Sequence, residues 1–426
     1  MLVSGSEVIV IAEKPVAGGR MLARHEGLVV LVVGAIPGER VRVRIERVTR
    51  QLVYADTIDV LDPDADRRPG AADWACGGLL YSHINYPRQQ ALKAELIADA
   101  FARIGKVTLP TPVDVAPSQE RGYRMRARLH ARNGRLGFFR EGTHDLCDAA
   151  MTGQLLPATA EAIERLCSAL GTRRLNGVVS CEIAENIPAD QRAVVIECNA
   201  STATVDGMEE MDEIEGITGL ALDVQGNPGP TMVYGSPYVL DALEVPGAPN
   251  TVQLRHHVRS FFQGNRWLVA QLVERLAGQV PDDDVMDLYA GVGLFAISLA
   301  AAGKTRVVAV EGDLASGLDL DANAAPYRPA VEVKRTAVER YLQQVGGTPF
   351  STAVLDPPRT GLSREAMAGV LNLQVPRVVY VACDVATLAR DVRRFLDDHY
   401  QLEHVEAFDL FPNTAHVEVL VVLTRT

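Results

Sequence analysis

The sequence predicts an α/β protein of three domains, in which a small β-barrel and a mixed α+β region precede a doubly wound, Rossmann-like sheet. At roughly 150 residues per domain, the 426 residues suggest about three domains. Short apolar runs broken by Gly and Pro fill the first 62 residues, as in small barrels. After about residue 262, strand-like and helix-like patterns alternate regularly, as in a mostly parallel sheet covered by helices. Hydrophobic residues make up 47% and charged residues 23%, a balance that excludes intrinsic disorder and collagen.

The first domain, residues 1–62, is expected to form a five-stranded barrel of the oligonucleotide-binding (OB) type. Its clearest strand is RVRVRIERV, in which Val41, Val43 and Ile45 share one face and charged side chains the other. The polar stretch DPDADRRPGAADW (62–74) contains Pro and Gly and indicates a linker.

The second domain, residues 75–245, combines a helical stretch at 87–105 with an Arg-rich strand region and β-like runs at 178–183, 192–198 and 231–235. This mixture predicts an α+β domain, and it assigns no chemistry by itself.

The third domain, residues 246–426, carries the regular alternation that predicts the doubly wound sheet. The expected strands are 285–290, 306–311, 331–335, 352–356, 377–382 and 416–426, and the expected helices are 265–277, 294–303, 337–345, 364–373 and 385–398.

The formal net charge of −12, taken alone, argues against a nucleic-acid partner. The charge is split along the chain, because residues 1–150 carry 21 Lys+Arg and 18 Asp+Glu, net +3, whereas the remainder is net −15. The stretch 121–140 holds seven Arg and no acid, and Arg124, Arg126 and Arg128 alternate as one face of a strand would. This face is either a phosphate-binding surface or an ordinary solvated one.

Two classes of protein have no support in the sequence. No run of about 18 apolar residues occurs, and the start MLVSGSEVIVIAEK lacks a basic region followed by a long apolar stretch, so we expect a cytoplasmic protein. The six cysteines are scattered and form no CxxC pair, so neither a disulfide framework nor a common zinc site is expected.

A candidate cofactor site follows the first strand of the third domain. In VMDLYAGVGLFAISLA the strand reaches Asp287 and turns through Gly291 and Gly293 into a helix, where a doubly wound fold binds a nucleotide-like cofactor. Glu311 ends the next strand, 24 residues after Asp287, about where an acid accepts hydrogen bonds from a ribose. Without the third glycine of the dinucleotide fingerprint, the turn suits S-adenosylmethionine better than a pyrophosphate; the alternative is tight strand-to-helix packing alone.

Further reactive side chains end other strands of this domain. Asp356 precedes the rigid turn PPRTGL, and is either a ligand-facing acid or a common turn residue. Cys383 follows a strand and precedes a helix N-terminus, which favours the thiolate of a nucleophile; the alternative is an inert, buried thiol. His416 and Glu418 begin the last strand, and either is a base or a surface group.

These residues, taken in order, resemble the motifs of the RNA 5-methyluridine (uracil-C5) methyltransferases, which use S-adenosylmethionine. The matching motifs are FFQGN (261–265), DLYAGVGLFAISLA (287–300), VVAVE (307–311), LDPPRTGL (355–362), YVACDVATLARD (380–391) and FPNTAHVE (411–418). The first 60 residues also resemble the family's TRAM barrel, and CGGLLYSHINYPRQQALKAEL and YRMRARLHARNGRLGFF resemble its central RNA-binding domain. The resemblance covers almost the whole chain and implies a class I methyltransferase domain at its carboxyl end.

The resemblance implies a role for each matching position. Cys383 would attack C6 of uracil as the nucleophile, and Glu418 would be the base that removes the C5 proton. The residues implied to bind S-adenosylmethionine are Gln263, Tyr289, Gly291, Gly293, Glu311 and Asp356. The barrel and the Arg-rich stretch are expected to hold RNA, with contacts from Arg124, Arg126, Arg128 and Arg132.

The chain departs from the family pattern in two places. Many relatives hold a [4Fe-4S] cluster with four cysteines, but only Cys76 and Cys147 match these positions, so neither a cluster nor another metal is expected. The nucleophile motif, usually Ser-Cys-Asn-Pro, is ACDV (382–385) here, and an acid such as Asp384 beside the thiol raises its pKa and slows attack.

The sequence therefore predicts an enzyme that makes 5-methyluridine in ribosomal or transfer RNA, acting as a monomer. Two alternatives stay open: an RNA cytosine-C5 methyltransferase, which also uses a Cys on C6, and a non-catalytic RNA-binding protein on the same scaffold. The sequence leaves the RNA and the uridine open, because RNA is recognised largely by shape and by splayed bases.

Overall fold

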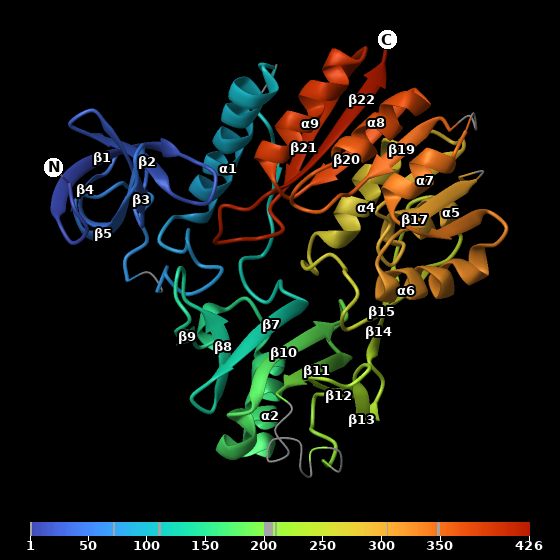
Figure 1. Cartoon of the computed structure of the whole chain (residues 1–426), viewed down its shortest axis with the longest axis horizontal. Helices are drawn as coiled ribbons and strands as arrows, with labels where there is room; N and C mark the ends of the chain where they lie inside the picture. The colour runs from blue at the N-terminus through green and yellow to red at the C-terminus, as the bar shows by residue number, and fades with distance from the viewer. Residues whose placement is uncertain are drawn as a thin grey trace.

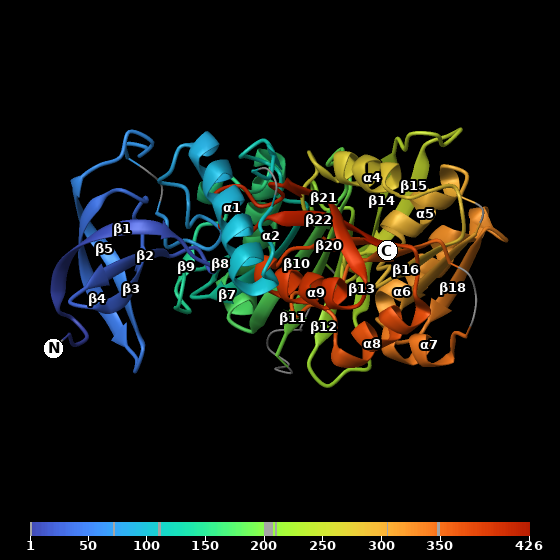
Figure 2. The ribbon, with the colours of Figure 1, turned by 90° about the horizontal axis from the view of Figure 1, so that it is seen from above.

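Three bodies of secondary structure make up the chain. The computed structural model describes residues 2–70, 73–109, 112–199, 208, 211–304, 306–346 and 350–426. In Figure 1 a barrel lies on the left, a second sheet at the bottom and the largest sheet at the upper right. Seen from above, the barrel and the largest sheet occupy opposite ends of an elongated molecule (Figure 2). The predicted α/β fold class is confirmed.

The amino-terminal body is a closed barrel in the strand order β1-β2-β3-β5-β4. Its strands are β1 (Glu7–Pro15), β2 (Met21–His25), β3 (Leu28–Val33), β4 (Arg40–Val48) and β5 (Leu52–Asp62). Val41, Val43 and Ile45 of β4 are buried in the barrel core, so the alternation in the sequence sets which face points inward. The fully buried Glu39 accepts hydrogen bonds from the Arg67 side chain, which fixes the linker against the barrel.

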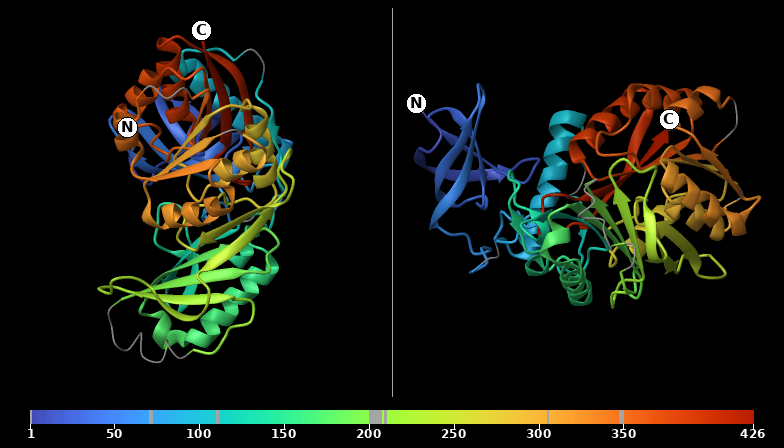
Figure 3. Two further views of the ribbon diagram at one scale, coloured as in Figure 1. Left: turned by 90° about the vertical axis from the view of Figure 1, so that its right-hand side faces the viewer. Right: turned by 60° about the horizontal axis from the view of Figure 1, so that its bottom comes forward.

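The central body is a seven-stranded sheet in the order β13-β12-β11-β10-β7-β8-β9. Its strands are β7 (Arg126–Arg132), β8 (Arg135–Phe139), β9 (Leu146–Cys147), β10 (Val178–Glu185), β11 (Arg192–Cys198), β12 (Gly219–Val224) and β13 (Thr231–Gly235). Helix α2 (Pro157–Leu175), broken at Gly171, covers one face (Figure 3), and the 3-10 turn η2 (Ala150–Thr152) precedes it. Leu129 of β7 and Leu166 of α2 belong to the core between them.

The carboxyl-terminal body is an eight-stranded sheet in the order β18-β17-β16-β19-β20-β22-β21-β6. Its strands are β6 (Val115–Ala116), β16 (Val285–Leu288), β17 (Val307–Glu311), β18 (Val331–Arg335), β19 (Thr352–Leu355), β20 (Arg377–Ala382), β21 (Tyr400–Phe408) and β22 (Glu418–Arg425). The five strands from β18 to β20 are parallel, whereas β22 runs antiparallel to β20 and to β21. The sequence pattern did not predict β21, in which Glu403, His404 and Glu406 interrupt the apolar alternation.

Helices cover both faces of this sheet, as a doubly wound fold requires. The helices are α4 (Val269–Gly278), α5 (Leu294–Ala301), α6 (Leu314–Ala324), the 3-10 turn η3 (Ala325–Tyr327), α7 (Val338–Gln344), α8 (Arg364–Leu373) and α9 (Val385–Asp397). One apolar cluster joins the sheet to α4, α5 and α6, and another joins it to α7, α8 and α9.

Helix α1 (Tyr86–Ala100), continued by the π-turn η1 (Phe101–Gly105), belongs by its contacts to the largest sheet. Its residue Ile97 lies in the same core cluster as α9, and β6 extends the sheet by pairing with β21. The hairpin β14 (Tyr238–Leu243) and β15 (Val252–His257) likewise packs on α6. The sequence pattern placed residues 75–245 in one domain, whereas these contacts join parts of that segment to the carboxyl-terminal body. The boundary between residues 245 and 246 stays a prediction.

Candidate active site

The turn after β16 has the backbone that close approach of a ligand needs. Gly291 and Gly293 have φ of 57° and 97°, in the left-handed region. A Cβ at Gly293 would lie 2.8 Å from side-chain atoms of Ile297 and Leu320, so packing alone requires this glycine. A Cβ at Gly291 would meet nothing closer than the Phe261 carbonyl oxygen at 3.8 Å. The space beside Gly291 is therefore open to a cofactor.

Glu311 braces this turn from the end of β17. Its Oε2 accepts the N–H of Gly291 at 2.8 Å, and its Oε1 accepts the N–H of Asp313 at 2.5 Å. Burial raises the pKa of this carboxyl. A carboxylate has about four acceptor positions, so Glu311 can still accept hydrogen bonds from a ribose.

Two more of the expected cofactor residues meet beside this turn. Gln263, which is 4% exposed, donates from Nε2 to Oδ2 of Asp356 at 3.4 Å. Burial raises the pKa of Asp356, and the Gln263 hydrogen bond opposes that shift. Tyr289, with φ of 65°, is partly buried against the core under α7 to α9. Gln263, Tyr289, Gly291, Glu311 and Asp356 thus lie along the carboxyl edge of β16, β17 and β19.

The thiol of Cys383 lies between the end of β20 and the start of α9. Burial, followed by the Glu418 carboxyl, raises its pKa to about 11, while the Arg359 guanidinium opposes the shift by its charge and a hydrogen bond. The expectation that the helix N-terminus favours the thiolate is therefore wrong for the protein alone, because desolvation dominates. The Asp384 side chain caps α9 by accepting the N–H of Thr387 at 2.8 Å.

Glu418 reaches the thiol because β22 is antiparallel. Ala382 of β20 pairs with Val419 of β22, so the first residue of β22 stands beside the last residue of β20. Glu418 is 2% exposed, and its burial, with the nearby Asp356 carboxyl, raises its pKa well above the usual range. Its neighbour His416 lies at the surface, where partial desolvation and the charge of Arg359 lower its pKa to about 4.

Arg359 is a site residue that the sequence argument missed. Its positive charge opposes the rise in the pKa of both Cys383 and Glu418. Its carbonyl oxygen accepts a hydrogen bond from Oγ1 of Thr387 at 3.1 Å, which ties the turn after β19 to α9. The signal was present in LDPPRTGL, three residues after Asp356, but a lone exposed Arg in a turn does not reveal its neighbours.

The Arg-rich stretch lies in the central body, and the four arginines expected to hold RNA already have partners within the protein. Arg124 donates to Gln154 Oε1 at 2.7 Å, Arg126 to the Val258 carbonyl at 3.1 Å, Arg128 to Glu197 Oε2 at 2.7 Å and Arg132 to the His144 carbonyl at 2.6 Å. Within the described part of the chain, the exposed side chains of Arg121 and Arg135 have no hydrogen-bonded or charged partner. The roles of Arg124, Arg126, Arg128 and Arg132 in RNA binding stay predictions.

Backbone hydrogen bonds connect this Arg-rich stretch directly to the cofactor segment. Met125 donates its N–H to the Gly264 carbonyl at 2.9 Å, and Arg266 donates its N–H to the Tyr123 carbonyl at 3.0 Å. The buried Arg266 side chain also pairs with Glu185 at the end of β10. The strand entering the central sheet is thus held next to Gln263.

Cys76 and Cys147, the two cysteines at cluster-ligand positions, are joined in a disulfide with Cα atoms 5.7 Å apart. This disulfide was not predicted. Among the described residues, no group of three His, Cys, Asp or Glu side chains is arranged to hold a metal. No helix in the described ranges is both long and apolar enough to cross a membrane.

The chain is similar to known enzymes over nearly its whole length. A family model described as tRNA (Uracil-5-)-methyltransferase matches residues 219–426, and a TRAM domain model matches residues 3–58. An uncharacterized RNA methyltransferase of Thermosynechococcus vestitus is 30% identical over 96% of each chain. The 23S rRNA (uracil(1939)-C(5))-methyltransferase of Aeromonas salmonicida is 30% identical, over 95% of this chain and 93% of the relative.

A solved structure shares the fold. The tRNA (uracil-54, C5)-methyltransferase of Pyrococcus abyssi, in complex with S-adenosyl-L-homocysteine, gives a TM-score of 0.76 at 22% identity, over 98% of this chain and 100% of that chain. The Aeromonas salmonicida relative is named for C5 of a uracil, not for a cytosine. The open turn at Gly291 and the acceptor at Glu311 fit the cofactor of these enzymes. The chain therefore belongs to the family of S-adenosylmethionine-dependent RNA uracil-C5 methyltransferases, and its amino-terminal barrel is a TRAM domain.

Proposed function

We propose that the protein methylates C5 of a uridine in a structured ribosomal or transfer RNA, through a covalent bond between Cys383 and C6 of the base. The supporting observation is that β20 and the antiparallel β22 bring the Cys383 thiol and the Glu418 carboxyl to one edge of the sheet. The cofactor turn at Gly291 lies at the same edge, after β16. Relatives named for a ribosomal and for a transfer RNA motivate the substrate class.

The cofactor residues fix where the methyl group is presented. S-adenosylmethionine supplies an electrophilic methyl group when bound. Gly291 leaves room for close approach, and Glu311 offers free acceptor positions for the ribose hydroxyls. Gln263 and Asp356 hold each other by a hydrogen bond at the end of β19, facing the same turn.

Cys383 makes the unreactive C5 atom nucleophilic. When the thiolate bonds to C6, the electron pair of the C5–C6 double bond moves to C5 and the O4 carbonyl as an enolate, which can take the methyl group. The thiol must first lose its proton to the solvent, and its pKa of about 11 makes the thiolate a minor species at neutral pH. Arg359 favours that species by its positive charge.

Glu418 completes the reaction. After methyl transfer, C5 carries both a hydrogen and the methyl group, and the Glu418 carboxylate removes the hydrogen as a proton. The C5–C6 double bond re-forms, the C6–S bond breaks, and Cys383 leaves as a thiolate. Since burial raises the pKa of Glu418, its ionised form is a stronger base than an exposed carboxylate.

RNA must deliver an unstacked uridine to this edge, because the thiol cannot reach C6 inside a helix. The TRAM barrel and the Arg121–Arg140 stretch are the surfaces that we assign to the RNA backbone. We further expect that the protein acts as a monomer in the cytoplasm.

Methylation of RNA from a strain that lacks the gene tests this function. We expect the purified protein and S-adenosylmethionine to produce 5-methyluridine, detected by nucleoside mass spectrometry, and Cys383→Ala to produce none. Cys167→Ala, which removes a partly buried thiol on α2, should match the unmodified protein. Undiminished product from Cys383→Ala would contradict the covalent mechanism, and 5-methylcytidine as the product would contradict the substrate.

A further inference from the structure

We propose that α1 positions the active site: Gln89 and Lys93 hold the loop 409–417, which carries His416 and leads into Glu418, in the arrangement that the base step needs. This loop, called the base loop below, connects β21 to β22. The inference rests on the proposed function, because it concerns the step that Glu418 carries out.

Lys93 anchors the beginning of the base loop. Its Nζ donates to Oδ1 of Asp409 at 2.5 Å and to the Phe411 carbonyl at 3.0 Å, and the side chains of Lys93 and Asp409 are both 0% exposed. A buried ammonium is stable only with such partners, and packing α1 on the sheet would be served as well by an apolar side chain. The directional bonds therefore set the course of the loop backbone.

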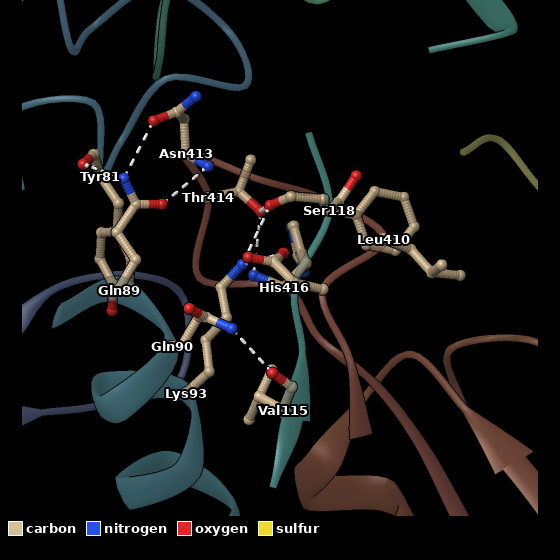
Figure 4. Close-up of polar contacts among 12 residues, drawn as sticks. Tyr81, Gln89, Gln90, Lys93, Val115, Ser118, Leu410, Asn413, Thr414 and His416 are labelled. Atoms are coloured by element: carbon tan, nitrogen blue, oxygen red, sulfur yellow. Dashed lines mark hydrogen bonds and ion pairs between the residues drawn. The ribbon is translucent and has the colours of Figure 1, made fainter. Parts of the chain in front are cut away.

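Gln89, one turn earlier on α1, makes two hydrogen bonds to Asn413 in the middle of the base loop. Its Oε1 accepts the Asn413 N–H at 2.9 Å, and its Nε2 donates to Oδ1 of Asn413 at 3.0 Å. The Tyr81 N–H donates to the Asn413 carbonyl at 2.8 Å. Figure 4 shows the Gln89 and Asn413 side chains paired, with His416 near Lys93.

Two further contacts enclose the base loop. Asn265, two residues after Gln263, donates from Nδ2 to the Leu410 carbonyl at 3.0 Å, which links the cofactor segment to the loop. Ala415 packs against the core cluster of the barrel, where a Cβ at Gly19 would lie 3.3 Å from its own Cβ. The loop beside the base is thus held at once by α1, by the cofactor segment and by the barrel.

A contact that positions Glu418 affects the reaction steps unequally. Formation of the bond from Cys383 to C6 does not need the base, whereas breakdown of the methylated adduct does. Loss of the hydrogen bonds from Gln89 or Lys93 to the base loop should therefore slow adduct breakdown more than adduct formation. A contact that only stabilises the fold would lower the melting temperature and leave the ratio of the two rates unchanged.

Gln89→Leu and Gln90→Leu form the matched pair that tests this inference. Gln90 lies on the same helix and donates to the Val115 carbonyl at 2.7 Å (Figure 4), and within the described part of the chain it makes no hydrogen bond to the base loop. In single turnovers on uridine RNA, we expect Gln89→Leu to accumulate an SDS-stable, Cys383-dependent adduct, with breakdown slowed about tenfold or more relative to formation. Gln90→Leu should keep the rate ratio of the unmodified protein, even with a similar loss of melting temperature.

Equal slowing of both steps in Gln89→Leu, or unchanged rates in a folded variant, would overturn the inference. If Gln89→Leu does not fold, Asn413→Gly replaces it, because glycine tolerates the φ of 64° at this position and removes only the side chain that Gln89 contacts. RNA containing 5-fluorouridine separates the two proposals, since its C5 fluorine cannot leave as a proton does. If the unmodified protein forms no adduct with this RNA, the proposed function fails. If it forms the adduct, and the variants match the unmodified protein at every step on uridine RNA, only the positioning role of α1 fails.

Discussion

The carboxyl edge of the largest sheet and the arginine face of β7 both collect ionisable side chains, but the protein treats their charges in opposite ways. At the sheet edge, burial raises the pKa of Cys383, Glu418 and Asp356, and these groups oppose one another's ionisation. On β7, Arg128 meets Glu197 and Glu182. Buried acidic groups with strongly shifted pKa values, as at the sheet edge, are typical of sites that do chemistry. Exposed ion pairs, as on β7, are typical of surfaces.

The largest effect is expected from Glu418→Gln, which removes the base without changing the size of the side chain. Turnover should fall by about 10²- to 10⁴-fold, the usual contribution of a general base. The adduct between Cys383 and RNA should still form and should accumulate, which denaturing gel electrophoresis would detect. Normal turnover would assign the base role elsewhere, with His416 as the next candidate.

Arg359→Gln is expected to slow adduct formation about 10- to 100-fold at neutral pH, because losing a nearby opposite charge moves the thiol pKa further upward by about one to two units. The sign of the pH dependence follows from the raised pKa of Cys383, about 11. The thiolate fraction rises with pH, so the rate of adduct formation should increase throughout the neutral to alkaline range, and the variant should recover at higher pH.

Rapid-quench measurements of adduct formation across pH would show this behaviour. Arg364→Gln, at the exposed start of α8, is the control and should follow the unmodified profile. A rate independent of pH would mean that the bound RNA and cofactor already lower the thiol pKa.

Alanine at the two turn glycines should separate binding from packing. Gly293→Ala should destabilise the protein by about 1–3 kcal/mol, because its Cβ would collide with Ile297 and Leu320. Gly291→Ala should cost about 1–2 kcal/mol from its positive φ, but weaken S-adenosylmethionine binding about tenfold or more by filling the open space. Thermal unfolding and calorimetric titration measure the two effects; equal losses of cofactor affinity in both variants would contradict a binding role for Gly291.

The smallest effects are expected on RNA affinity, and they concern the second region of the comparison. Arg135→Ala removes an exposed guanidinium without a partner in the described structure, and should lower the slope of affinity against salt by about one unit. Arg128→Ala removes one already paired with Glu197 and should change the slope much less. Filter binding at several salt concentrations would compare them, and a larger effect of Arg128→Ala would show that RNA displaces the glutamates.

The sequence predicted which side chains meet at the sheet edge better than it predicted the neighbours of the arginines, and the reason is physical. Residues at the carboxyl ends of parallel strands must meet at one edge, so Glu311, Asp356 and Cys383 could be grouped from the strand pattern alone. A run of arginines fixes no such meeting point. Whether Arg128 faces a phosphate or a glutamate depends on β10 and β11, which are distant in sequence.

The barrel, most of the strands and helices after residue 262 and the glycine turn could be predicted from the sequence, because these depend on local periodicity and backbone conformation. Strand β21 and helix α6 were missed. Three other features depend on contacts that form only in the folded chain. The antiparallel course of β22 places Glu418 beside Cys383; burial overrides the helix N-terminus and raises the thiol pKa; and α1 leaves the middle segment to bind the base loop. Each feature depends on contacts between groups that are far apart in the sequence, such as Lys93 and Asp409. No local sequence pattern contains that information.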